Sequence, residues 1–133
     1  MRAMNAPARA VLWDMDGTLI DSADYHFHSW VEALRPEGLT VTREQFLSTF
    51  GWKNDRILRR WSGPKIEPER LERIADAKEA GYRQIVRTRG LQPLPGAAEW
   101  IRALRRDGWA QAVASSAPRA NIDVALDVLG WTG

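Results

Sequence analysis

The chain has 133 residues, the size of one ordinary domain and enough to bury a hydrophobic core. Its 44% hydrophobic and 27% charged residues are typical of a globular protein and exclude disordered and fibrous classes. The formal net charge is +2, and the arginines are scattered and not gathered into a run, which argues against nucleic-acid binding.

The sequence contains no cysteine, which excludes disulfides and thiolate metal sites and favours a reducing compartment. The stretch "MRAMNAPARA" (1–10) lacks the apolar core of a signal peptide, and no apolar run approaches the length of a membrane span. We therefore expect a soluble, cytoplasmic protein that binds neither nucleic acid nor membrane.

The first predicted element is a short buried strand at residues 9–14, "RAVLWD", where a compact apolar run is closed by Asp14. From Ser22 the apolar residues recur at helical spacing until Pro36 and Gly38 interrupt the pattern. The sequence thus begins with a strand followed by a helix.

Three further helices are predicted next. The stretch "VTREQFLSTF" (41–50) carries a capping box made by Thr42 and Gln45. A second helix is expected within "NDRILRRW" (54–61), and a long amphipathic one within "EPERLERIADAKEAGYRQIVRTR" (67–89). Together these segments form a four-helix insertion after the first strand.

The segment "GLQPLPG" (90–96) is the clearest linker, because it holds two prolines and two glycines. After it the pattern predicts a helix (97–108), a strand (109–116) and a final helix (117–130). This order predicts an α/β fold, in which a parallel β-α-β unit carries a helical module after its first strand.

Seven tryptophans raise the possibility of a stacking platform. Most occupy apolar positions of predicted strands and helices and are expected in the core. These core candidates are Trp13, Trp30, Trp100 and Trp109. Trp52 is the tryptophan expected in a functional loop.

Asp14 and Asp16 stand two residues apart just beyond the first predicted strand, where the turn at Gly17 lets both face one opening. The carboxyl ends of parallel strands are where α/β sheets bind ligands. Two carboxylates suit a hard cation such as Mg²⁺ facing a phosphate, with one acid as nucleophile and the other moving a proton. The competing interpretation is a solvated Asp-Gly turn.

The string "DMDGTLIDS" (14–22) resembles the first motif of the haloacid dehalogenase superfamily. The helices after it resemble the α-helical cap of the β-phosphoglucomutase-like phosphatase branch. Further along, "LQPLPG" (91–96) resembles the return to the core, and "AVASSAPRANI" (112–122) resembles the second motif. Several motifs in the family's order make the resemblance specific.

The resemblance implies a partial Rossmann-like core at residues 1–20 and 91–133, with an inserted helical cap at 21–90. The chain stops before the lysine of the third motif and the acids of the fourth, and Asp123 and Asp127 lie on a helix and do not replace them. We therefore expect a C-terminally truncated chain with a weak Mg²⁺ site, and self-association or partner binding through the incomplete sheet.

By this resemblance, Asp14 is the nucleophile that forms an aspartyl-phosphate, and Asp16 is the general acid and then the base. The Asp14 carboxylate and the Asp16 main-chain carbonyl would bind Mg²⁺. The transferring phosphoryl group would be held by hydroxyl or N–H groups of four residues: Gly17, Thr18, Ser115 and Ser116.

Four residues of the insertion are candidates for contact with a substrate: His26, Trp52, Asn54 and Lys78. His26 falls in a "YHF" string that lies near the active-site entrance in this branch, with a surface or core-edge histidine as the alternative. Lys78 matches a basic residue that some relatives direct toward substrate, and its alternative is a solvated lysine. Asn54 stands where mutases carry an arginine, which favours a phosphatase.

These inferences predict a Mg²⁺-dependent phosphatase that acts on a small phosphorylated metabolite of the sugar-phosphate type, with impaired activity in this chain. A mutase of the β-phosphoglucomutase type is one alternative. A non-catalytic protein that binds a partner through its sheet is the other.

Overall fold

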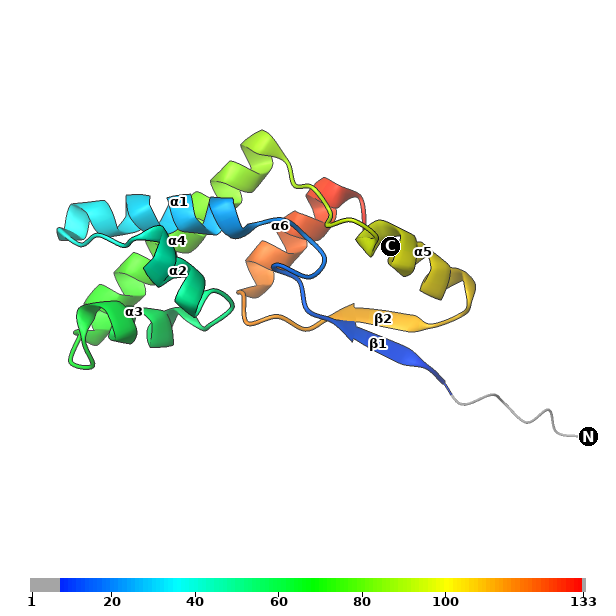
Figure 1. Ribbon diagram of the computed structural model, residues 1–133, viewed down its shortest axis with the longest axis horizontal. Helices are drawn as coiled ribbons and strands as arrows, with labels where there is room; N and C mark the ends of the chain where they lie inside the picture. The colour runs from blue at the N-terminus through cyan, green and yellow to red at the C-terminus, as the bar shows by residue number, and fades with distance from the viewer. Residues whose placement is uncertain (1–7, 133) are drawn as a thin grey trace, which may run out of the picture.

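The computed structural model describes residues 8–132, so parts of the predicted core (1–7 and 133) lie outside the described residues. The elements are β1 (Ala10–Trp13), α1 (Ala23–Leu34), the short 3-10 helix η1 (Arg35–Glu37), α2 (Arg43–Thr49), α3 (Asn54–Ser62), α4 (Pro68–Arg89), α5 (Ala97–Arg106), β2 (Ala110–Val113) and α6 (Arg119–Leu129) (Figure 1). The predicted order of strand, four helices, helix, strand and helix is confirmed.

The two strands pair in parallel, with Ala10 opposite Ala110 and Trp13 opposite Val113. The pairing continues past the strands, because the N–H of Ala114 donates to the carbonyl of Trp13 at 2.7 Å. Parallel pairing brings the loops that follow both strands to the same edge of the sheet (Figure 1). The first and second sequence motifs therefore lie side by side.

The prediction of a buried first strand is wrong. Exposed and half-buried residues alternate along both strands, and Leu12 is 74% exposed. Trp13 and Val113 pack against the same buried cluster as Ile101 of α5 and Ile122 of α6. Side chains of a strand alternate between the two faces, so one covered face leaves every second residue of β1 outside.

Helices α1 to α4 enclose a hydrophobic cluster around Trp30, whose largest buried members are Trp30, Leu34, Phe46, Ile57, Leu58 and Ile74. The predicted capping box of α2 is present, since Thr42 Oγ1 accepts from the N–H of Gln45 and Gln45 Oε1 accepts from the N–H of Thr42. The longest helix, α4, has 22 residues, yet no helix within residues 8–132 combines the length and apolar character needed to cross a membrane.

A second cluster lies beside the sheet and joins β1, the loop after it, α5 and α6. Its buried members are Met15, Leu19, Ile20, Tyr82, Val86, Leu91, Ala97 and Ala125. Tyr82 and Val86 belong to the second half of α4, so this one helix contributes to both clusters. The long helix thereby fixes the helical layer against the loop that carries the two aspartates.

Only Trp30 among the four tryptophans predicted for the core is buried. Trp100 is 62% exposed, and Trp13 and Trp109 are partly exposed. In α5 the neighbouring Ile101 packs against the second cluster. Adjacent residues of a helix point about 100° apart, so the helix that buries Ile101 leaves Trp100 in solvent.

Candidate active site

Asp14 follows β1 directly and is exposed. Its Oδ1 accepts from the N–H of Met15 at 2.9 Å, and its Oδ2 accepts from the hydroxyl of Thr18 at 3.3 Å. Both donors belong to its own loop. The carboxylate is therefore held in place by its own loop while the side chain remains exposed.

Gly17 makes the tight turn of this loop with φ +75°, a conformation that side chains of other residues rarely adopt. A Cβ at this position would lie 3.3 Å from Cε1 of Phe50, at the end of α2. A glycine at this position thus permits the tight turn and leaves room for the Phe50 ring of the helical layer.

The main-chain N–H groups in this turn are used within the loop. The N–H of Gly17 donates to the carbonyl of Ile20 at 3.0 Å, and the N–H of Thr18 donates to that of Met15 at 3.2 Å. Phosphate binding by Gly17 and Thr18 remains a prediction.

Asp16 is largely buried, unlike Asp14, since its side chain is only 12% exposed. Its Oδ1 accepts from the hydroxyl of Ser22 at 2.7 Å and from His26 Nε2 at 2.8 Å. Burial acts to raise the pKa of Asp16, but the contacts of His26 and Ser22 and the charge of Lys78 outweigh it and leave that pKa below its usual value.

His26 is buried in α1, with its ring stacked on Tyr82 at a centroid distance of 4.0 Å. Its Nδ1 lies 2.9 Å from Lys78 Nζ. An ammonium only donates, so Nδ1 accepts and the Nε2–H donates to Asp16. Burial and the Lys78 charge lower the pKa of His26, in keeping with a neutral ring. The interpretation of His26 as a surface residue is wrong.

Lys78 is 3% exposed, so its interpretation as a solvated lysine is also wrong. Its Nζ donates to Glu79 Oε1 at 2.9 Å and lies 5.3 Å from the ring centroid of Trp30. Burial lowers the pKa of Lys78, while the Glu79 carboxylate opposes that shift. Asn54, at the start of α3, donates from Nδ2 to Glu79 Oε1 at 2.7 Å.

Sequence reasoning missed Glu79 and Asn121. Glu79 Oε2 accepts from Nδ2 of Asn121, which is fully buried in α6 and also accepts at Oδ1 from Arg83 Nη1 at 2.9 Å. The sequence does point to this part of the long helix. Lys78 lies on one helical face with positions 74, 82 and 86, which are all apolar. A charged residue on such a stripe predicts a buried charge that needs partners.

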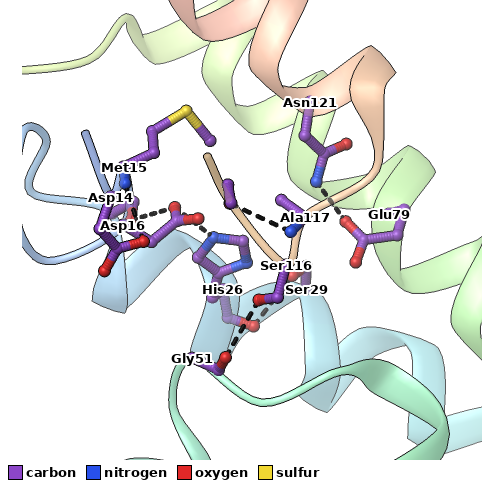
Figure 2. Close-up of polar contacts among 12 residues, drawn as sticks. Asp14, Met15, Asp16, His26, Ser29, Gly51, Glu79, Ser116, Ala117 and Asn121 are labelled. Carbon is purple, nitrogen blue, oxygen red and sulfur yellow. Dashed lines mark hydrogen bonds and ion pairs between the residues drawn. The ribbon is translucent and has the colours of Figure 1, made fainter. Parts of the chain in front are cut away.

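The loop after β2 carries Ser115 and Ser116. Ser115 Oγ accepts from the N–H of Ala117 at 3.0 Å, just before α6 begins. Ser116 Oγ donates to the carbonyl of Gly51 at 3.0 Å, across to the loop between α2 and α3 (Figure 2). The two serines therefore face different partners, and the Ser116 side chain ties the two halves of the site together.

A cavity of about 40 Å³ lies between the helices and the two loops. Six of the predicted site residues line it: Asp16, His26, Trp52, Asn54, Lys78 and Ser116. The other four, Asp14, Gly17, Thr18 and Ser115, are not part of its wall. The structure therefore brings the helical candidates together around Asp16 and leaves Asp14 outside.

The donors of this site suit Mg²⁺ in chemical type. The exposed Asp14 carboxylate and the Asp16 main-chain carbonyl supply hard oxygens, while the Asp16 carboxylate is engaged by Ser22 and His26. Residues 8–132 contain no cluster of three or more His, Cys, Asp or Glu side chains placed to hold a metal. Binding of Mg²⁺ by the Asp14 carboxylate and the Asp16 carbonyl remains a prediction.

Comparison with known proteins identifies the family of this chain. Residues 8–133 match the family model of haloacid dehalogenase-like hydrolases. The chain belongs to this family. The resemblance drawn from the "DMDGTLIDS" motif is confirmed.

A curated relative is CbbY of Rhodobacter capsulatus, 29% identical over 126 residues that cover 89% of this chain and 55% of CbbY. β-Phosphoglucomutase of Clostridium difficile superposes with a TM-score of 0.77 at 21% identity, over 92% of this chain and 57% of that one. A CbbY variant of Rhodobacter sphaeroides, solved in complex with xylulose-1,5-bisphosphate, superposes with a TM-score of 0.77 at 20% identity, over 91% of this chain and 56% of that one. The chain spans about half the length of these proteins, and the superpositions show the shared fold.

Proposed function

We propose that this chain carries the active site of a Mg²⁺-dependent phosphomonoester hydrolase in which Asp14 is the nucleophile. The observation that carries the proposal is the contrast between two aspartates only two residues apart. Asp14 is open to a ligand, and Asp16 is buried against a histidine. A nucleophile must be accessible, whereas a proton-transfer group needs a controlled pKa.

In the first step an Asp14 carboxylate oxygen forms a bond to phosphorus, and the bond from phosphorus to the ester oxygen breaks. The products are an aspartyl-phosphate and a leaving alkoxide that takes a proton. The Asp14 carboxylate and the Asp16 carbonyl would hold Mg²⁺, which would supply charge neutralisation at the phosphoryl group. Met15 N–H and the Thr18 hydroxyl keep the attacking carboxylate in position.

Asp16 moves the proton in both steps. It gives a proton to the leaving oxygen, and as a carboxylate it then takes one from the water that hydrolyses the aspartyl-phosphate. The contacts of Ser22 and His26, which lower the pKa of Asp16, favour the carboxylate form needed for the second step. Lys78 fixes the histidine tautomer and so the direction of the His26–Asp16 hydrogen bond.

Ser115 is the proposed hydroxyl donor to the transferring group. Its oxygen accepts from the N–H of Ala117, so its own hydrogen is left to point toward a phosphoryl oxygen. We assign residues 1–20 and 91–133 to the core and 21–90 to the cap, an assignment supported by the cavity between the helices and the two loops. The substrate class, a small phosphorylated metabolite, follows the phosphosugar named for the two solved relatives.

The test is phosphate release from 4-nitrophenyl phosphate by the purified chain, with Mg²⁺ and with EDTA. We expect Mg²⁺-dependent release that Asp14→Asn abolishes. Transfer of a phosphoryl group from acetyl phosphate to Asp14, detected by mass spectrometry, is a second readout that needs no full turnover. Release that survives in Asp14→Asn contradicts the assignment, and sugar-phosphate interconversion without release identifies a mutase.

A further inference from the structure

The cavity beside Asp16 lies on the leaving-group side of the proposed reaction, and this inference rests on that proposed function. Asp16 lines the cavity and Asp14 does not. An acid that protonates the leaving oxygen must be within hydrogen-bond reach of it. The remainder of the leaving group therefore extends from Asp16 into the cavity, and the cavity wall selects the substrate.

The wall of the cavity carries four titratable groups: Asp16, His26, Lys78 and Glu79. The Lys78 ammonium lies 2.9 Å from the Glu79 carboxylate, so its charge is already compensated. His26 is neutral, as its contact with Lys78 requires. The one ammonium of the wall is thus paired with a carboxylate, and the wall has no free positive charge.

Two guanidinium groups, those of Arg56 and Arg83, contact neighbouring residues without lining the cavity. Arg56 lies over the ring of Trp52 at 3.8 Å from its centroid, and Arg83 donates to Asn121. Within residues 8–132 the cavity is lined by one cation, Lys78, and by no arginine. A second phosphate or a carboxylate on the leaving group would thus find no free cation in this wall, because Lys78 is paired with Glu79.

The polar groups that remain suit hydroxyls. Asn54 Nδ2 donates to Glu79, which fixes the amide and directs its oxygen to act as an acceptor. Glu79 itself is an acceptor, and Trp30, Phe50 and Ile57 supply apolar surface. A volume of about 40 Å³ holds a group of only a few heavy atoms.

We infer that the leaving group is a small uncharged polyol, and that Glu79, by pairing with Lys78, denies a cation to esters that carry a second anionic group. In this specificity the chain differs from the solved CbbY variant, whose complex contains a bisphosphate. Discrimination of this kind comes from the cost of burying an anion without a partner of opposite charge.

Glycerol 3-phosphate and 3-phosphoglycerate make a matched test, since they differ by a carboxylate in place of one CH₂OH group. We expect the chain to favour glycerol 3-phosphate by about tenfold or more in kcat/KM, which corresponds to about 1.4 kcal/mol. Titration calorimetry on the Asp14→Asn variant should show the same preference in binding, without turnover.

Glu79→Gln removes the charge and keeps the shape, so it should bring the ratio of the two substrates close to one by improving 3-phosphoglycerate. Glu72→Gln, an exposed position on the same helix, should leave the ratio unchanged. If Glu79→Gln does not fold, Asn54→Arg supplies a cation at a half-buried position and should move the ratio in the same direction.

Equal or better use of 3-phosphoglycerate by the unmodified chain overturns the inference. So does a ratio that neither Glu79→Gln nor Asn54→Arg changes. If 4-nitrophenyl phosphate is hydrolysed while 3-phosphoglycerate is preferred, the inference fails and the proposed function stands. If no ester is hydrolysed and Asp14 accepts no phosphoryl group, the proposed function fails, and calorimetry alone decides the binding preference.

Discussion

The two-stranded sheet and the helical layer of α1 to α4 are built differently. Along β1 and β2 every second residue is exposed, and Leu12 is 74% exposed. The helical layer instead surrounds Trp30, Phe46 and Leu58, each no more than 1% exposed. The sheet therefore places the loops that carry the two aspartates and the two serines, while the helical layer buries the largest side chains and contributes most to stability.

We expect stability and the proposed chemistry to depend on different residues, except where the two regions meet. Asp14 lies on the sheet side and is hydrogen-bonded within its own loop. His26 and Lys78 lie on the helical side, where Lys78 donates to His26 and His26 donates to Asp16. Substitutions in each region should separate the two properties, and substitutions at the junction should change both.

The largest expected effect is on the sheet side. Asp14→Asn should lower the rate of phosphate release by about 10³-fold or more, because the variant has no nucleophile. The melting temperature should stay the same, since Asp14 is exposed and an asparagine can accept from the Met15 N–H through Oδ1 and donate to the Thr18 hydroxyl oxygen through Nδ2. A steady-state assay measures the rate and a thermal melt on the same samples measures stability. A large fall in melting temperature would show that Asp14 is also needed for stability.

The next effect belongs to the helical layer. Trp30→Ala should lower the free energy of unfolding by about 3–5 kcal/mol, because it empties a fully buried site. Trp100→Ala is the matched control, since the same residue type is 62% exposed there and its loss should change stability by only about 0.5 kcal/mol. Urea unfolding measures the free energy of unfolding of both variants. Equal losses in the two variants would contradict the difference in burial between Trp30 and Trp100.

At the junction, His26→Gln should lower kcat by about tenfold or more while KM changes little, because Asp16 loses the partner that orients it. The acid limb of the pH–rate profile should move to higher pH as the pKa of Asp16 rises. His28→Gln, on the exposed face of the same helix, is the control. A His26→Gln profile that coincides with that of the unmodified chain would show that the histidine is only structural.

The smallest effect is on the pH dependence of stability. The folded-state pKa of His26 lies below its ordinary value of 6.5 because of burial and the Lys78 charge, so the unfolded chain binds the proton more readily. The free energy of unfolding should therefore fall as the pH drops below about 6.5. Melting curves at several pH values should show this loss, and His26→Gln should reduce it.

A melting temperature that stays constant from neutral pH down to pH 5, a range chosen around the ordinary histidine pKa of about 6.5, would contradict the buried neutral ring. The contribution of Asp16 to the free energy of unfolding changes at lower pH. Its pKa is below the usual 3.8, so its contribution is present above that value and is lost as the pH falls through the folded-state pKa.

Local patterns predicted much of the fold. Apolar spacing located both strands and all six α-helices, and the Thr42–Gln45 capping box is present as predicted. The motif "DMDGTLIDS" identified the family and named Asp14 and Asp16. These features depend on residues close together in the chain, where spacing, turn chemistry and capping act directly.

The sequence by itself determined the order of elements, the family and the two aspartates. The tertiary structure decided the rest: that Trp100 is exposed, that His26 and Lys78 are buried, and that Glu79 and Asn121 join them. Glu79 and Asn121 are 42 positions apart, and their contact exists only because α4 and α6 pack together. Burial and pKa depend on such distant neighbours, which no local pattern encodes.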